Sequence, residues 1–262
     1  MNAPAPQLPP GAKEPEGEVR LTFMEHLRDL RQRLKLALMG LAVGMAVIGY
    51  WVPELTDGLL RFVREALPED HQNIKYLTPV EPLMVYFKVA MYGGLFVAAP
   101  WVLYQLWQFV APGLYKKEKK VVVPFLIFGT LLFYAGAAFC YWLVMPQAFP
   151  AMLAVASPNL EASLTLDQTF GLALAMLLGF GVVFEVPVVI AFLAMIGLVN
   201  WKTLAKYRRI AIVVNVVAAA IITPTGDPIN LALMAIPMIL FYEIGIILAR
   251  ILGKKDQPEP AT

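Results

Sequence analysis

The chain has 262 residues, of which 59% are hydrophobic and 15% are charged, and its formal net charge is +2. Soluble domains contain about 25% charged residues, so this composition excludes an ordinary soluble domain and indicates a membrane protein. The net charge is too small for a nucleic-acid-binding surface. The single cysteine, Cys140, lies in an apolar run, which excludes a disulfide framework and a thiolate metal site.

The two ends of the chain differ in composition from the part between them. Residues 1–20 are rich in proline, alanine and glutamate and contain no apolar stretch, and residues 254–262 are similarly polar. We expect both segments to be disordered and residues 21–253 to form one membrane domain. No pattern of a cleavable signal peptide is visible at the start of the sequence.

Six apolar runs follow one another along this domain, and a membrane-spanning helix needs about 20 apolar residues. The runs cover residues 36–52, 82–110, 121–144, 170–199, 210–222 and 228–249. The fifth run has only 13 residues, which reach about 20 Å as a helix. Because Arg208 and Arg209 precede it and a proline-containing turn follows it, we still predict a hairpin with the sixth run.

The predicted fold is an all-α polytopic membrane protein with six transmembrane helices. We expect a curved bundle, because the second and fourth spans are long and contain Pro100 and Pro187 whereas the last two are short. Between the first and second spans, apolar residues recur at helical spacing over residues 55–67. This pattern predicts an amphipathic helix that lies at the outer interface or caps the bundle.

The lysines and arginines predict the orientation of the spans. Of the 21 such residues, 17 lie before the first span, after the sixth, or in the second and fourth connections. Three lie in the first connection, and Lys88 lies inside the second span. Because positive residues stay on the cytoplasmic side, both termini are expected to be cytoplasmic.

A charged helix start leads into the first span. Residues 23–33 read F-M-E-H-L-R-D-L-R-Q-R, and the two acids, Glu25 and Asp29, share one helix face. Three leucines supply an apolar stripe beside three arginines. A snorkelling anchor that obeys the positive-inside rule explains the arginines, but it does not explain Glu25. A helix of this kind can meet lipid headgroups or a charged partner.

The second cytoplasmic connection combines aromatic, basic and acidic residues. Trp107, Phe109 and Tyr115 are compatible with an ordinary interfacial aromatic belt. Glu118 is flanked by four lysines. It is either neutralised by these neighbours or available to a cationic ligand.

Glu185 is the most costly residue to place in a membrane, since a carboxylate near the bilayer centre costs about 2.5–3.5 kcal/mol. It is expected to face the bundle interior, as a functional group or as a structural hydrogen-bonding residue. Gln105 and Thr223 are candidate polar neighbours. His26 and His71 are isolated, so no metal site is expected, and no catalytic motif occurs.

Four separated motifs resemble those of the TatC family, the signal-peptide receptors of the twin-arginine protein translocase. The first, F-x-E-H-L-x-E-L-R-x-R, is matched from Phe23 to Arg33 with Asp29 in place of the second glutamate. The second, P-x-x-x-Y-Q-x-W-x-F-x-x-P-x-L-Y-x-x-E, is matched from Pro100 to Glu118.

The third and fourth motifs lie in the second half of the chain. A buried F-E-x-P is matched at residues 184–187, and a T-P-x-D turn is matched loosely at residues 223–227 with one extra residue, Gly226. The resemblance covers nearly all of residues 23–253.

The resemblance implies a receptor in the plasma (inner) membrane that binds paired-arginine signal peptides and helps to export folded proteins using the proton gradient. The residues implied in peptide binding are Glu25, Leu30, Arg31, Tyr115 and Glu118. Those implied in partner docking are Ile222, Thr223 and Asp227. Implied partners are TatA- and TatB-like single-span proteins, further copies of this chain and membrane lipid. No cofactor and no enzymatic activity are expected.

Two alternatives remain open from the residues. A proton-coupled secondary transporter would use Glu185 as the proton or ion carrier, but the chain has no inverted repeat and one acid at membrane depth. A structural scaffold subunit would bind no charge-dependent ligand at the cytoplasmic rim.

Overall fold

The computed structural model describes residues 23–67, 74–110, 122–154, 164–222 and 228–253, and within these ranges every regular element is helical. The helices, in chain order, are α1 Phe23–Gly49, α2 Val52–Ala66, α3 Glu81–Val110, α4 Val122–Phe139, the π-helical turn η4 Cys140–Val144, α5 Met145–Ala154, α6 Leu166–Phe184, α7 Val186–Met195, α8 Trp201–Lys206, α9 Arg208–Ile222 and α10 Pro228–Leu252. The predicted all-α class is confirmed.

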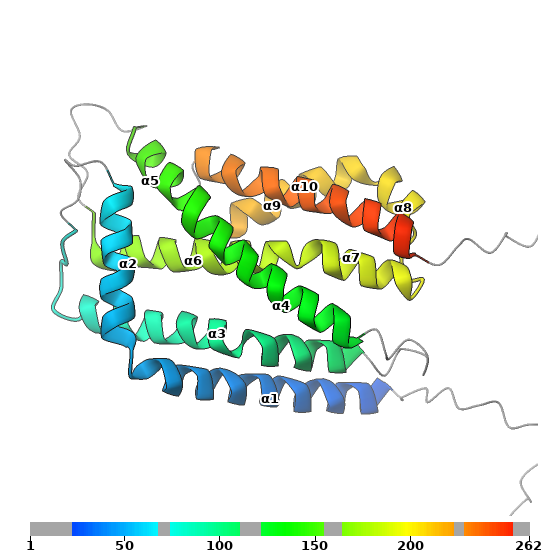
Figure 1. Ribbon diagram of the computed structural model, residues 1–262, viewed down its shortest axis with the longest axis horizontal. Helices are drawn as coiled ribbons and strands as arrows, with labels where there is room; N and C mark the ends of the chain where they lie inside the picture. The colour runs from blue at the N-terminus through cyan, green and yellow to red at the C-terminus, as the bar shows by residue number, and fades with distance from the viewer. Residues whose placement is uncertain (1–22, 68–73, 111–121, 155–163, 223–227, 254–262) are drawn as a thin grey trace, which may run out of the picture.

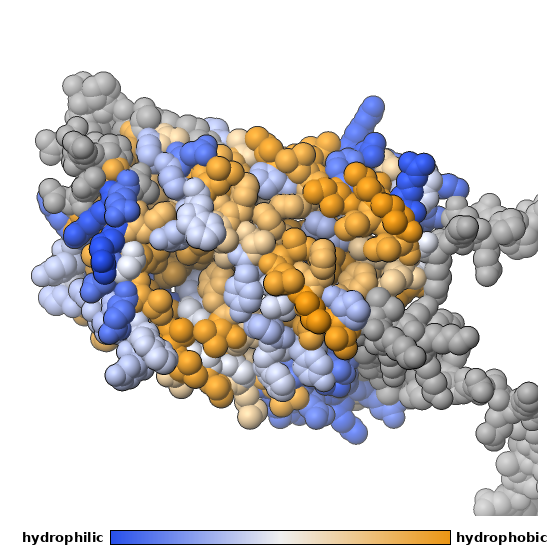
Figure 2. Space-filling view, in the orientation of Figure 1, coloured by the Kyte–Doolittle hydropathy of each residue, from blue (hydrophilic) through white to orange (hydrophobic). Residues whose placement is uncertain are grey.

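The long helices lie beside one another in a row (Figure 1). In this row α1 packs on α3, α3 on α6, and α7 on α10, while α4 crosses in front and packs on α6. Helix α2 runs across one end of α3 (Figure 1). Space-filling Figure 2 shows hydrophobic side chains across the middle of this face and strongly hydrophilic ones mostly toward its two ends. This distribution fits a multi-pass membrane protein.

Within the described residues, five helical segments are long and apolar enough to cross a membrane: α1, α3, α4 to α5, α6 to α7, and α10. Helix α9, the predicted fifth span, has 15 residues, about 22 Å. Only one of the two C-terminal spans is therefore short. Helix α10 has 25 residues, because the helix continues past the predicted end through Arg250, Ile251 and Leu252.

The third span is longer than predicted. We expected it to end at residue 144, but α5 continues the helix to Ala154. A regular helix would bring the ring of Pro146 against the carbonyl group of residue 142. The π-helical turn Cys140–Val144 ends two residues before this proline, and the Met145 amide donates to the Cys140 carbonyl oxygen. The widened turn lets the helix pass the proline.

The fourth span is broken where the sequence predicted a proline kink. Helix α6 ends at Phe184 and α7 begins at Val186, with Pro187 in its first turn. Gly197, with a φ of 84°, ends the segment in a conformation that glycine adopts readily. The chain then enters the six-residue helix α8, which we did not predict.

The core is built around α6. Phe170 and Phe180 are fully buried, and Phe180 packs with Cys140 of η4 and Met234 of α10. The amphipathic helix expected at residues 55–67 is α2, which inserts Val63 into the same cluster. Its Phe62 ring stacks on Tyr141 with 3.8 Å between ring centroids. Helix α2 therefore caps the bundle.

Candidate functional site

The site expected at the cytoplasmic rim depends on how α1 and α3 approach each other. A Cβ atom on Gly44 would collide with the carbonyl group of Gly94, and one on Gly94 would lie 2.6 Å from the amide nitrogen of Met45. The two backbones are therefore in direct contact, as small residues allow between membrane helices. This crossing keeps α1 against α3.

Closer to the N-terminal end of α1, a tryptophan fastens the two helices. The indole Nε1 of Trp101 donates a 2.9 Å hydrogen bond to the carbonyl oxygen of Leu36. A side chain on Gly40 would collide with the Trp101 ring. The sequence therefore leaves room for the ring about one helical turn beyond Leu36, and the hydrogen bond fixes the register of α1 and α3 at this point.

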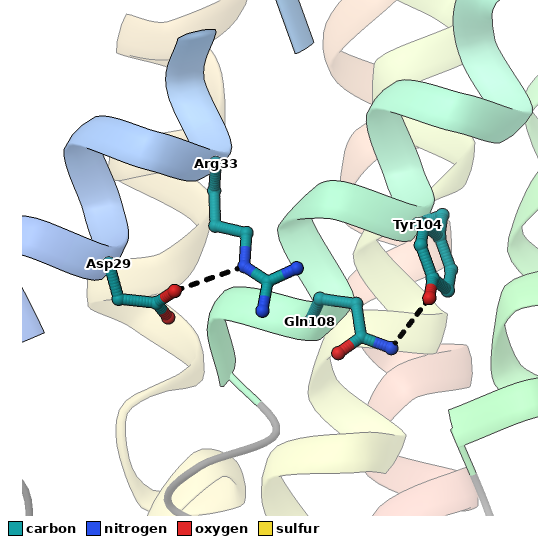
Figure 3. A network of polar contacts seen from close by, with 4 residues as sticks. All are labelled: Asp29, Arg33, Tyr104 and Gln108. Carbon is teal, nitrogen blue, oxygen red and sulfur yellow. Dashed lines mark hydrogen bonds and ion pairs between the residues drawn. The ribbon is translucent and has the colours of Figure 1, made fainter. Parts of the chain in front are cut away.

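Polar side chains gather where the N-terminal end of α1 meets the C-terminal end of α3 (Figure 3). Arg33 Nε donates a 3.1 Å bond to Asp29 Oδ1 on α1, and its guanidinium group points toward Gln108 on α3. Gln108 Nε2 in turn donates to the hydroxyl oxygen of Tyr104 at 3.0 Å. Asp29 Oδ2 is buried and has no hydrogen-bond partner within the described residues. The junction is thus polar, and one of its acceptors, Asp29 Oδ2, has no donor among the described residues.

Three of the five residues implied in peptide binding lie on the first turns of α1. Glu25, Leu30 and Arg31 are all exposed. Tyr115 and Glu118 lie outside the described residues, so their approach to Glu25 stays a prediction. The structure does show the condition for it, because the N-terminal end of α1 and the C-terminal end of α3 lie together.

Trp107 does not belong to an interfacial aromatic belt. It is 5% exposed and packs edge-on against Phe192 of α7, with 4.4 Å between ring centroids. Phe125 of α4 completes this aromatic cluster. The belt interpretation is therefore wrong for this residue, because α7 and α4 cover the face of α3 that carries it.

Glu185 lies at the break between α6 and α7 and faces α4, as expected of a carboxylate directed toward the bundle interior. A Cβ atom on Gly129 of α4 would lie 2.8 Å from Glu185 Oε2. Gln105 is 2% exposed, and the Oε1 atoms of both residues are buried without a hydrogen-bond partner among the described residues. The neighbour that the structure places against Glu185 is thus the helix at Gly129. Thr223, the other suggested neighbour, lies outside the described residues.

The residues implied in partner docking are not described in detail. Ile222 ends α9, but its side chain falls outside the described part of the structure, as do Thr223 and Asp227. Their role stays a prediction. Among the residues that the structure does describe, no group of three His, Cys, Asp or Glu side chains could hold a metal ion.

Sequence reasoning missed an ion pair that joins α3 to α6. Lys88 Nζ lies 2.7 Å from Asp167 Oδ1. Close by, Lys75 forms an isolated bridge with Thr165: its amide donates to the Leu164 carbonyl oxygen, and its own carbonyl oxygen accepts from the Leu166 amide. A lysine inside a span needs a partner, and the acid in the first turn of the fourth span was the signal that could have suggested one.

The chain is similar in sequence to proteins of a known family. A family model described as Sec-independent protein translocase protein (TatC) matches residues 25–237. The protein of that name from Koribacter versatilis (strain Ellin345) is 38% identical over 259 residues, covering 97% of this chain and 95% of the relative. Its namesake from Aquifex aeolicus (strain VF5) is 35% identical over 239 residues, covering 90% and 98%.

A solved structure agrees with the sequence relatives. The crystal structure of a twin-arginine translocase receptor, TatC, is 34% identical and superposes with a TM-score of 0.77, covering 87% of this chain and 99% of that one. The chain belongs to the TatC family of Sec-independent protein translocases.

Proposed function

We propose that this protein is the receptor of a twin-arginine translocase and binds paired-arginine signal peptides at the inner ends of α1 and α3. The observation that carries the proposal is the polar junction there. Asp29 holds Arg33 at 3.1 Å on α1, and the exposed Glu25 lies one turn earlier on the same helix face. The connection that carries Glu118 leaves α3 from this same junction.

Two carboxylates would suit two arginines for a geometric reason. A guanidinium group is a planar fork that meets a carboxylate with two parallel hydrogen bonds, whereas lysine is a point charge. Each charge-assisted bond contributes about 1.5–3 kcal/mol. Loss of one such bond should weaken binding by about tenfold or more.

The test compares a paired-arginine peptide with a paired-lysine peptide by calorimetry or site-specific crosslinking. Glu25→Ala and Glu118→Ala should each lower arginine-peptide binding by about tenfold, and Glu118→Asp should be milder. Glu65→Ala, on the exposed face of α2 at the other end of the bundle, is the matched control and should leave binding unchanged. The unmutated protein should bind the lysine peptide poorly.

Simple attraction to a charged rim makes the opposite prediction. Removing acids from a basic surface should not harm one particular cationic peptide. Equal binding of the two peptides, insensitive to both alanine substitutions, would remove the receptor role from Glu25 and Glu118.

We further propose a plasma (inner) membrane location with both termini in the cytoplasm. Labels at residues 3, 117, 202 and 262 should then react only from the cytoplasm, and labels at 73, 159 and 226 only from outside. The 17 inner lysines and arginines support this orientation. Finding residues 202 and 226 on the same side would show that α9 does not cross the membrane.

The partners that we propose are TatA- and TatB-like single-span proteins and further copies of this chain, with the proton gradient driving export of folded cargo. Docking would involve Ile222, Thr223 and Asp227 at the end of α9. Crosslinkers at these positions should capture single-span partners, and crosslinkers at Gly49 should not. We propose no catalytic step and no cofactor. Family membership does not favour a proton-coupled transporter, for which Glu185 was the only candidate carrier.

A further inference from the structure

Pro100 interrupts the backbone hydrogen bonding of α3 within the span. The helix continues through this residue, but a proline has no amide hydrogen to donate to the carbonyl oxygen four residues earlier. That carbonyl oxygen belongs to Phe96. Water does not reach the interior of a membrane, so a carbonyl group freed in this way needs a donor from a neighbouring helix.

Tyr134 of α4 supplies this donor. Its hydroxyl group donates a 2.8 Å hydrogen bond to the carbonyl oxygen of Phe96. The contact is supported by the adjacent residue, because the Phe133 ring packs on the Phe96 ring with 5.3 Å between centroids. The Tyr134 hydroxyl group therefore takes the place of the amide that Pro100 lacks.

The same turn of α3 is bound to α1 on the other side of the proline. Trp101, the residue after Pro100, donates its indole hydrogen bond to the Leu36 carbonyl oxygen. Two helices thus hold this turn, α4 through Phe96 and α1 through Trp101. Because the proline has removed one hydrogen bond of the helix itself, these two side-chain bonds set the direction in which α3 leaves the turn.

The part of α3 beyond Pro100 carries the polar junction with α1. Tyr104 and Gln108 lie about one and two turns beyond the proline, and the Arg33 guanidinium group points toward Gln108 (Figure 3). Val110, the last residue of α3, is about 15 Å from Pro100 along the helix, so a change of about 10° at the proline would move it by about 3 Å. That movement is as long as a hydrogen bond.

We propose that Tyr134 is a positioning residue, whose hydroxyl group replaces the missing Pro100 amide and holds the C-terminal end of α3 in the arrangement with α1 that binds a paired-arginine peptide. Tyr134 acts through the backbone of α3 and takes no direct part in binding. Its effect on peptide affinity rests on the proposed function, whereas its effect on the shape of α3 does not.

The first test measures the shape of α3 without any peptide. Spin labels at residues 87 and 106, exposed positions on either side of Pro100, report the distance across the turn by double electron–electron resonance. Cys140 is buried and takes no label. Tyr134→Phe should broaden the distance distribution. Tyr86→Phe is the matched control and should leave it unchanged, because Tyr86 is similarly exposed, 42% against 39%, and its hydroxyl group has no hydrogen bond within the described residues.

The same measurement in a second background identifies the cause. Pro100→Ala restores an amide that bonds to the Phe96 carbonyl oxygen, so adding Tyr134→Phe to it should not broaden the distribution further. Pro237→Ala removes a proline from inside α10 instead. In that background Tyr134→Phe should keep its full effect.

The second test measures binding of the paired-arginine peptide by calorimetry. The apparent affinity falls with the fraction of molecules in the binding arrangement, and one hydrogen bond between membrane helices biases such an equilibrium by about threefold. Tyr134→Phe should therefore weaken binding by about threefold in the natural and Pro237→Ala backgrounds. It should cause no further loss in the Pro100→Ala background.

Three results would overturn the proposal: an unchanged distance distribution in Tyr134→Phe, an equal effect of Tyr134→Phe in both proline backgrounds, or a broadened distribution with unchanged peptide affinity. If Pro100→Ala does not fold, the comparison of Tyr134→Phe with Tyr86→Phe in the natural background decides. If the unmutated protein bound no paired-arginine peptide, the proposed function would fail, and the distances would still decide whether Tyr134 holds the turn at Pro100.

Discussion

The α1–α3 pair and the broken helix α6–α7 show two different ways of placing a helix in this membrane protein. In α1, 6% of the most apolar window is buried inside the protein, and in α6–α7 the share is 67%. The buried segment α6–α7 is also more apolar than α1, and yet it carries Glu185. The outer pair is held by glycines and one tryptophan hydrogen bond.

Hydropathy alone does not decide which membrane helix is central, because α10 is nearly as apolar as α6–α7 (mean hydropathies of 2.3 and 2.4) and yet only 28% of its window is buried, against 67%. Lipid tails are as apolar as leucine, so helices associate through close packing and interhelical hydrogen bonds. Helix α1 packs closely along α3 on one side, through Gly40 and Gly44, whereas α6 packs against α3, α4 and α10. Because those contacts exclude lipid from α6–α7, a carboxylate is tolerated there.

The largest expected effect comes from placing a side chain between the backbones of α1 and α3 where they are in contact. Gly44→Leu should destabilise the protein by about 3 kcal/mol, because its side chain would collide with the backbone of Gly94. The free energy of unfolding can be measured by titration with SDS in mixed micelles. Gly49→Leu, in the same helix with nothing within 4 Å of the added Cβ atom, should change it little. Equal effects of the two substitutions would mean that the contact is not tight.

In the central helix, the decisive substitution is at Glu185. Glu185→Gln should keep most of the export of a folded reporter protein, because the amide still forms hydrogen bonds. Glu185→Ala should lose about 1–3 kcal/mol of stabilisation in the functional state, roughly a tenfold loss of export. Gly129→Ala, whose Cβ would lie 2.8 Å from the carboxylate, should disturb the same group. Equal failure of the Gln and Ala variants would instead indicate proton transfer by this carboxyl.

The ion pair between Lys88 and Asp167 connects the two regions. A double-mutant cycle with Lys88→Met and Asp167→Asn should give a coupling free energy of about 1 kcal/mol, since both side chains are partly exposed. The matched control is the more exposed pair Arg208–Glu243, with an expected coupling below about 0.5 kcal/mol. A zero coupling for Lys88–Asp167 would show that the apolar contacts alone join α3 to α6.

The smallest expected effect concerns the hydrogen bond between Trp101 and Leu36. Trp101→Phe keeps an aromatic ring in the space beside Gly40 but removes the donor, at a cost of about 0.6 kcal/mol. Trp142→Phe is the control, since this exposed indole has no hydrogen bond within the described residues. Thermal unfolding in detergent compares the two. A larger loss for Trp142 would contradict the assigned role of the Trp101 donor.

The sequence by itself determined the properties that depend on residues close to one another along the chain. Apolar run length predicted where the spans lie, and the observed α3 and α9 differ from those predictions by no more than two residues. Apolar residues that recur at helical spacing predicted α2. The acids and arginines of α1 could be identified as one motif because they occupy one short segment, and their role in peptide binding stays a prediction.

Only the tertiary structure decided which distant residues meet. The pairing of Lys88 with Asp167, the burial of Trp107 against Phe192, and the position of Glu185 against Gly129 each join different helices. In a membrane every span is apolar, so hydropathy does not distinguish the face that meets a helix from the face that meets lipid. Shape and hydrogen bonding between helices make that distinction, and they arise only when the helices are packed together.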